Sequence, residues 1–233
     1  MPATKIPARS ATRYELKAVV EDAVLPSVQM WLRLHDACFY SRFPQRRVNS
    51  LYFDTPSLDS FDDNLAGSLR RHKVRLRWYG SSLENVETIF EVKIKHNRHG
   101  WKLSQKIAQP LAFERLNWTE LLAVLRRELA PELLSYLNQG CEPVLLVRYQ
   151  REYYETFDGR LRVTLDYQVQ SFGQRHYGQL TLRYPLPRSA KVIVEFKASQ
   201  DDSVALAAVL NSAPFRITRS SKYADGVAAM FNY

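Results

Sequence analysis

Cysteine is scarce in this chain, whose 233 residues include only Cys38 and Cys141. Two cysteines cannot form a disulfide framework, and they show no C-x-x-C spacing for zinc, so we expect a reducing compartment. No apolar run approaches the length of a membrane span, and the first residues, MPATKIPARSAT, lack the apolar stretch of a secretory signal. The sequence therefore predicts a soluble, cytoplasmic protein.

Common catalytic signatures are missing as well. The chain has neither a GxxxxGKS/T phosphate loop nor a GxSxG nucleophile elbow, and its five histidines show neither HxxxH nor HxH spacing. These absences disfavour P-loop chemistry, serine-hydrolase chemistry and histidine-held metals. The four tryptophans are spread so that no two lie close on one strand face. Base stacking is therefore disfavoured, and we expect no nucleic-acid partner.

Positive charge is abundant, with a formal net charge of +9 at pH 7. Such an excess indicates an anionic partner, which can be a nucleic acid, a membrane surface or a phosphate-rich small molecule. Charge alone does not choose among these three. Hydrophobic residues make up 45% of the chain and aromatic residues 12%, which is enough for a substantial core.

The pattern along the chain predicts one domain, residues 12–233, after a flexible lead of residues 1–11. Period-2 alternation and turn residues predict eight strands at about 12–19, 46–54, 69–79, 88–96, 144–154, 160–169, 179–184 and 191–198. Helical periodicity predicts helices at about 24–37, 56–66 and 111–138, and two more that Asp201-Asp202 and Ser220-Ser221 would cap.

The segment LRRHKVRLRWY, residues 69–79, is typical of a strand but carries an unusual charged face. Because side chains alternate between faces, one face would hold Arg71, Lys73, Arg75 and Arg77, and the other Val74, Leu76 and Trp78. Four cations in a row repel one another unless an anion lies among them. The alternative is an ordinary solvated basic face, and this strand alone does not choose between the two.

Four further segments alternate in the same way. Their charged faces would hold Glu91, Lys93 and Lys95; Arg160, Arg162 and Asp166; Glu195 and Lys197; and Arg13, Glu15 and Lys17. If the strands belong to one curled sheet, amphipathic helices can cover their apolar faces from outside. The predicted fold class is α+β: an eight-stranded, mostly antiparallel, tunnel-like β-barrel with a charged lumen, flanked by helices. This inverts the usual small barrel, whose interior is filled by side chains.

A lumen crowded with arginine and lysine suits a polyanion, because guanidinium groups hold phosphate oxygens bidentately. Carboxylates among the cations would repel phosphate unless a divalent cation such as Mg²⁺ bridges the two. The carboxylates in question are Glu15, Glu91, Asp166 and Glu195. Glu195 is the best metal candidate among them. The alternative makes all four internal salt-bridge partners that keep the cations apart.

These residues resemble the VTC domain, the polyphosphate polymerase module of the vacuolar transporter chaperone complex, within the CYTH-like triphosphate tunnel metalloenzyme superfamily. The matching segments are RYELK (13–17), SLYFDTPSLDSF (50–61), KVRLRWYG (73–80), FEVKIK (90–95), RYQRE (148–152), RLRVTLD (160–166), VEFK (194–197) and SKYADG (221–226). The resemblance implies an eight-stranded tunnel that binds triphosphate. It also implies extension of a polyphosphate chain from ATP with a divalent metal, Mn²⁺ or Mg²⁺.

Carried over to this chain, the resemblance implies catalytic cations at Arg75, Arg77, Lys93, Arg151 and Arg162. Phosphate-binding positions would be Arg13, Lys17, Lys73, Lys106, Lys197 and Lys222, with Lys102 as the alternative to Lys106. Metal ligands would be Glu195, Glu15 and Glu91. Alternation cannot place both Arg148 and Arg151 on one face, and the Tyr-x-Arg match favours Arg151.

One departure concerns the first strand, where the wider superfamily has an ExExK pattern. This chain has Arg13 in place of the first glutamate and keeps only Glu15 and Lys17. The difference argues against the thiamine-triphosphatase and adenylate-cyclase branches and agrees with VTC-like proteins.

The predicted function is therefore a polyphosphate polymerase whose partners are ATP and inorganic polyphosphate or triphosphate. The alternatives are an inorganic triphosphatase of the same tunnel type and a non-catalytic polyphosphate-binding module. A separate membrane-protein partner would place the domain at the periphery of the inner membrane.

Overall fold

The computed structural model describes residues 13–97 and 99–231. Its strands are β1 (Arg13–Glu21), β2 (Phe39–Asp54), β3 (Arg70–Tyr79), β4 (Ile89–His96), β5 (His99–Lys106), β6 (Glu142–Thr156), β7 (Leu161–Gly173), β8 (Lys191–Ser199) and β9 (Ile217–Thr218). Its α-helices are α1 (Leu25–Leu34), α2 (Asp59–Ala66), α3 (Trp118–Glu128), α4 (Pro131–Leu137), α5 (Ser203–Asn211) and α6 (Lys222–Met230). The predicted lead, residues 1–11, lies outside the described residues.

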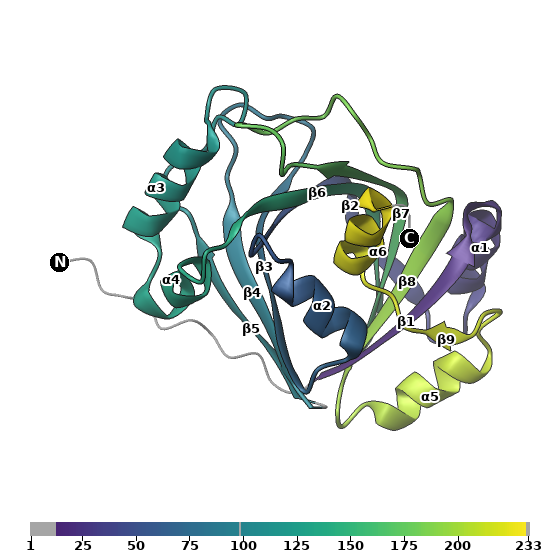
Figure 1. Cartoon of the computed structure of the whole chain (residues 1–233). Helices are drawn as coiled ribbons and strands as arrows, with labels where there is room; N and C mark the ends of the chain where they lie inside the picture. Colours follow the sequence, from purple (N-terminus) through teal and green to yellow (C-terminus); the bar gives the residue numbers. More distant parts are fainter. Residues whose placement is uncertain (1–12, 98, 232–233) are drawn as a thin grey trace.

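All nine strands form one antiparallel sheet in the order β5-β4-β3-β2-β6-β7-β8-β1-β9. The sheet curls strongly (Figure 1), so that Lys93 on β4 reaches Glu15 on β1 across its concave side, with Nζ to Oε1 at 2.7 Å. Among the described residues no backbone pairing joins β5 to β1 or β9, so the sheet is not closed. The prediction of an antiparallel α+β tunnel fold is confirmed, with nine strands in place of eight.

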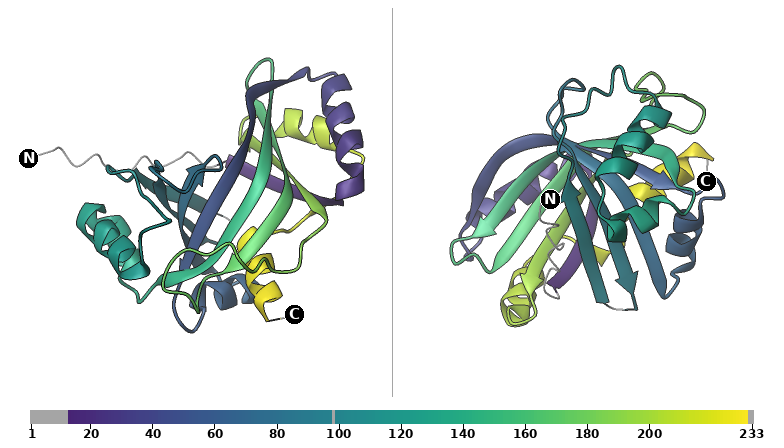
Figure 2. Two further views of the ribbon diagram at one scale, coloured as in Figure 1. Left: turned by 90° about the horizontal axis from the view of Figure 1, so that it is seen from above. Right: turned by 90° about the vertical axis from the view of Figure 1, so that its left-hand side faces the viewer.

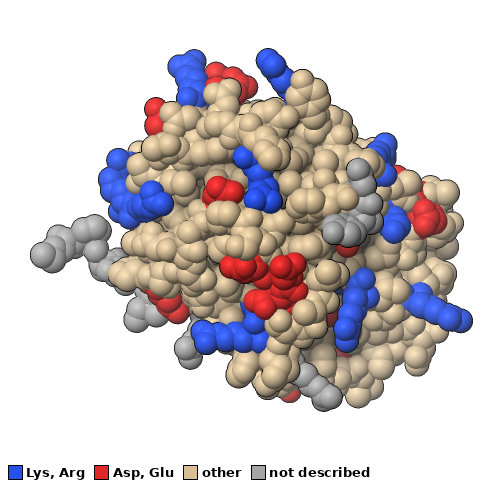
Figure 3. All heavy atoms as spheres, in the orientation of Figure 1, with Lys and Arg blue, Asp and Glu red and all other residues tan. Residues whose placement is uncertain are grey.

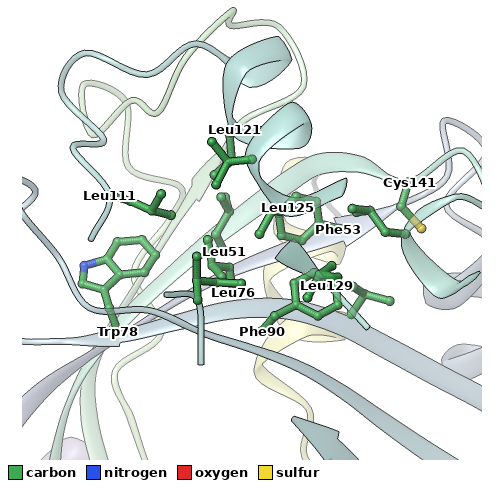
Figure 4. Packing of buried hydrophobic residues seen from close by; sticks show 14 of the residues in the cluster. Leu51, Phe53, Leu76, Trp78, Phe90, Leu111, Leu121, Leu125, Leu129 and Cys141 are labelled. Carbon is green, nitrogen blue, oxygen red and sulfur yellow. The ribbon is translucent and has the colours of Figure 1, made fainter. Parts of the chain in front are cut away.

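Two apolar layers lie on the convex side of the sheet. Helices α3 and α4 place Leu121, Leu125 and Leu133 against the outward residues of β2 to β5, including Trp78 and Phe90 (Figure 4). Helices α1 and α5 cover the outward residues of β7, β8 and β1 in the same manner, from the opposite side of the molecule (Figure 2). The prediction that the apolar core lies outside the sheet, under helices, holds for these two clusters, whereas a third buried apolar cluster lies on the concave side with α2 and α6.

Helices α2 and α6 instead pack together at one end of the concave side. The carboxylate of Asp54, fully buried at the end of β2, holds them in place. It accepts hydrogen bonds from the backbone N–H groups of Ser60 and Phe61 in the first turn of α2, at 3.0 and 3.1 Å. It also accepts one from the hydroxyl of Tyr223 on α6. One carboxylate thus ties the sheet to both helices.

Several predicted elements differ from the structure. No strand forms at 179–184, where Gln179 makes only an isolated bridge to Asn117. Strand β5 is not among the predicted strands. It is an edge strand whose outward side carries few apolar residues, so its alternation in the sequence is weak. The single helix predicted at 111–138 is two helices, because Pro131 begins α4 and cannot continue α3. Within the described ranges, no helix is long and apolar enough to cross a membrane.

The Asp54 anchor gives a testable prediction about stability. Replacing Asp54 with alanine should lower the free energy of unfolding by about 2 to 4 kcal/mol, because buried N–H groups and a hydroxyl lose their acceptor. Asp62→Ala is the matched control in the same first turn, where an exposed carboxylate contributes about 1 kcal/mol or less. Urea denaturation measures both variants, and equal losses would contradict the anchoring role.

Candidate functional site

Charged side chains from neighbouring strands line up on the concave face of the sheet. The register sets Arg75 opposite Glu91 and Lys73 opposite Lys93, at the β3–β4 pair. On the other half of the sheet, β6 and β7 pair Arg151 with Asp166. The register likewise pairs Lys17 with Glu195 and Glu15 with Lys197, between β1 and β8. Because these strands are neighbours, period-2 alternation turns their charged rows toward one space.

Asp166 is the centre of the first ionic cluster. Its fully buried carboxylate accepts two hydrogen bonds from the Arg151 guanidinium, at 2.5 and 2.7 Å, and one from Lys222 Nζ at 2.5 Å. Burial alone would raise the pKa of this carboxyl, but Arg151 and Lys222 outweigh burial and lower the pKa. The Tyr149 ring lies beneath both cations, 5.3 Å from the guanidinium and 4.7 Å from Nζ.

Glu91 is the centre of the second cluster. Its Oε2 lies 2.7 Å from Arg75 Nε and 3.6 Å from Arg77 Nε, and its Oε1 accepts a hydrogen bond from Lys102 at 2.7 Å. Burial opposes ionisation here too, yet Arg75, Arg77 and Lys102 lower the pKa of Glu91 strongly. Both carboxylate oxygens of Glu91 thus face cations, as in a salt bridge.

Glu15 and Glu195 form the third cluster, between β1 and β8. Glu15 accepts hydrogen bonds from Lys93 at 2.7 and 2.8 Å, and Lys17 lies 3.3 Å away. Glu195 pairs with Lys197 at 2.8 Å. Burial opposes ionisation of both carboxylates, and the charge of Glu195 also opposes that of Glu15, but the surrounding cations lower both pKa values.

Lys73 differs from the other cations on this face. Its Nζ donates to the Ser221 hydroxyl at 2.7 Å and, among the described residues, pairs with no carboxylate. Burial first, and then repulsion from Lys17, Lys93, Arg71 and Arg75, lowers its pKa from 10.5 to about 7. Four residues further along the same face of β3, the buried Nε of Arg77 has no hydrogen-bond partner in the described part of the chain. Positive charge is therefore in excess around Lys73, where β3 meets the start of α6.

The structure shows which of the remaining predicted residues lie on the concave face and which do not. It turns Arg151 inward, while Arg148 on the other face donates to Asn49 at 2.9 Å. It brings Lys102 into the Glu91 cluster and leaves Lys106 outside, exposed and paired with Glu87, because the turn to β5 sets Lys102 opposite Lys93. Arg162 lies half-exposed at the margin, 3.6 Å from Glu155. The backbone of Arg13 pairs with Ser199, and its side chain lies outside the described part.

The sequence analysis overlooked two inward-facing residues of β6. Tyr149 lies beneath the cations of the Asp166 cluster, and buried Glu155 pairs with Arg42 and Arg162. Alternation from Arg151 would have found both, since residues 149, 151, 153 and 155 share a face.

No group of three histidine, cysteine, aspartate or glutamate side chains gathers into a metal cage within the described residues. Mg²⁺ commonly uses only one or two carboxylates together with phosphate oxygens and water. Glu15 and Glu195, which lie close enough for the charge of Glu195 to oppose ionisation of Glu15, fit that mode. The donor set thus suits a divalent ion that binds together with phosphate.

The outer surface lacks a comparable concentration of positive charge on the face that Figure 3 shows. Lysine and arginine side chains are scattered there, and acidic side chains gather near α2, whose first turn carries Asp59 and Asp62. Much of the positive charge of the chain is instead directed to the concave side of the sheet.

Solved structures share this fold. An adenylyl cyclase candidate from Hippeastrum, described as having a dominant triphosphatase activity, is 16% identical, with a TM-score of 0.56 over 93% of this chain and 95% of that chain. An adenylate cyclase candidate from Vibrio parahaemolyticus is also 16% identical, with a TM-score of 0.50 over 94% of this chain and 99% of that chain. At such identities the likeness establishes the fold.

Comparison with curated proteins finds no match. The family model of the VTC domain matches residues 12–231, which is nearly the whole chain and includes all three ionic clusters. This chain therefore belongs to the VTC domain family.

Proposed function

We propose that this protein is a polyphosphate polymerase that transfers the γ-phosphate of ATP to the end of an inorganic polyphosphate chain. The observation that carries the proposal is the excess of positive charge around Lys73 on the concave face. A half-buried lysine whose pKa falls to about 7 lacks an anion that would stabilise its charge. Linked phosphates carry closely spaced negative charges, which can stabilise the positive charge around Lys73.

In this proposal the arginines hold the nucleotide. Arg75, Arg77 and Arg151 bind the triphosphate, and Arg162 at the margin contacts its outer part. Glu91 and Asp166 keep Arg75 and Arg151 in position before ATP arrives, so little reorganisation is needed during transfer. Lys17, Lys73 and Lys197 balance the charge of the phosphates.

The remaining cations orient the acceptor. Lys93 and Lys222 place the terminal phosphate of the chain in line with the γ-phosphorus, and a contact from Arg13 stays a prediction of the sequence. An oxygen of that terminal phosphate forms the new P–O bond, while the bond between the γ-phosphorus and the β,γ-bridging oxygen breaks. ADP leaves with that electron pair. Glu195 and Glu15 would hold a divalent ion, Mn²⁺ or Mg²⁺, which supplies charge stabilisation on phosphate oxygens.

The state of the carboxylates favours transfer to phosphate over hydrolysis. Glu15, Glu91, Asp166 and Glu195 all have lowered pKa values because cations surround them. A carboxylate with a lowered pKa is a poor general base for water. A phosphate oxygen is already ionised and needs no base. Inorganic triphosphatase activity is the second candidate, and it would release orthophosphate without chain growth.

Cytoplasmic location and a separate membrane-protein partner stay predictions of the sequence. The function proposed here requires ATP and polyphosphate as partners and does not require nucleic acid.

Arg77 provides the test of the proposed site. Its Nε has no hydrogen-bond partner in the described part of the chain, and Glu91 keeps Arg75 and Lys102 when Arg77 is removed. Arg77→Ala should therefore fold normally and lower kcat/KM for ATP-dependent chain growth by about 100-fold or more. Staining of polyphosphate on gels measures the product.

Arg126→Ala, on the exposed side of α3, is the control that loses the same charge and should keep full activity. If the Arg77→Ala variant extended polyphosphate as fast as the wild type, the concave face would not be the site of the reaction.

Lys73 predicts how binding depends on pH. Phosphates next to Lys73 should raise its pKa from about 7 back toward 10.5, so the protein takes up a proton on binding triphosphate at about pH 8. Affinity should then fall as pH rises above 7, by at most about tenfold per pH unit. Calorimetry in two buffers with different ionisation enthalpies measures the uptake. In the Lys73→Met variant, the proton uptake on binding should fall by the amount that Lys73 contributes. If the uptake were unchanged, another group would be the one that takes up the proton.

A further inference from the structure

The two helical layers leave part of the convex face uncovered. Along the outward side of β6, Leu146 packs under α3 and α4, and Tyr154 belongs to the cluster under α1 and α5. Between them, Arg148 and Gln150 contribute to a pocket of about 260 Å³. The outer arginine pocket, as we call it, is lined by Arg47, Arg148, Arg188, Gln150, Gln168 and Gln170, together with Tyr149.

Charge in the outer arginine pocket is unbalanced. No carboxylate lines it. Arg188 pairs with Asp22 at 3.1 Å, whereas Arg148 donates only to the neutral Asn49 side chain. Arg47 makes no side-chain hydrogen bond or ion pair with any described residue. Burial and the charge of Arg47, which lines the same pocket, lower the pKa of Arg148.

A β-bulge shapes the pocket. The register between β6 and β7 shifts between Arg148 and Gln150, and Gln168 on β7 takes a left-handed conformation with φ of 52°. The extra residue lets Gln168 line the same pocket as Gln170, while Asp166 stays on the concave side. The left-handed conformation of Gln168 costs conformational free energy and places an amide donor beside three arginines. Such strain is typical of ligand-binding sites.

We propose that the outer arginine pocket binds a small phosphate anion, orthophosphate or pyrophosphate, at a site separate from the concave face. Guanidinium and amide groups together donate in the directions that phosphate oxygens accept. At about 260 Å³ the pocket is smaller than the usual range for drug-sized ligands, about 300 to 1,000 Å³, and suits a small anion better than a whole nucleotide. Without carboxylates, the pocket offers a hard cation only neutral amide oxygens beside three positive charges, which disfavours cation binding.

NMR titration with inorganic pyrophosphate tests the proposal at the residues concerned. The side-chain amide signals of Gln150, Gln168 and Gln170 should shift and saturate in the wild-type protein. In Arg47→Gln/Arg148→Gln the affinity should fall by about tenfold or more, because charge-assisted hydrogen bonds are lost. Arg115→Gln/Arg126→Gln removes the same charge from exposed positions and should bind as the wild type does.

Two results would overturn the assignment. One is an unchanged affinity in the Arg47→Gln/Arg148→Gln variant, and the other is an equal, non-saturating shift with sulfate at the same ionic strength, which indicates screening. If the double variant does not fold, the pyrophosphate affinity of Arg47→Gln alone tests the assignment. This variant should fold, because the Arg47 guanidinium makes no hydrogen bond or ion pair with any described residue. Because these signals report the outer pocket directly, they stay interpretable even if the Arg77 variant shows that the concave face is not catalytic.

Discussion

Carboxylates placed between rows of cations, three of them buried, are the interaction on which this structure depends. Asp166, Glu91 and the pair Glu15 and Glu195 each hold two or more cations at hydrogen-bond or ion-pair distance. Without them, like charges on neighbouring strands would repel in a region of low dielectric. With them, the guanidinium groups are held in fixed positions, while the concave face keeps an excess of positive charge.

That arrangement requires the apolar core to lie elsewhere. Helices supply it on the convex side, in two clusters that cover opposite ends of the sheet. Helices α2 and α6 are the exception, since they pack on the concave side. Helix α6 brings Lys222 to Asp166 and is fixed by the bond from Tyr223 to Asp54. The division explains how a chain with a net charge of +9 can shield many of its cations from bulk solvent.

Local patterning predicts much of this fold, because alternation is visible within a single strand. The charged row of β3 and the apolar row behind it follow from residues 69–79 alone. Pairing across the sheet does not follow, since Lys93 and Glu15 are 78 residues apart in the chain and meet only because the sheet curls. The placement of Lys102 in preference to Lys106 likewise depends on the register of an edge strand with little apolar signal.

The resemblance to the VTC domain favours Arg151 over Arg148, which alternation alone leaves open, and the structure turns Arg151 inward. The outer arginine pocket has no sequence signal of its own, because its arginines come from three separate segments and a bulge aligns its glutamines.

The most direct test of the central claim follows all phosphorus species at once during incubation of the protein with ATP and Mg²⁺. Phosphorus NMR separates ATP, ADP, orthophosphate and the internal phosphates of a growing chain. Polymerase activity predicts that ADP and internal chain phosphate rise together while orthophosphate stays low. Orthophosphate released one for one with ADP, or ATP that stays intact, would contradict the account.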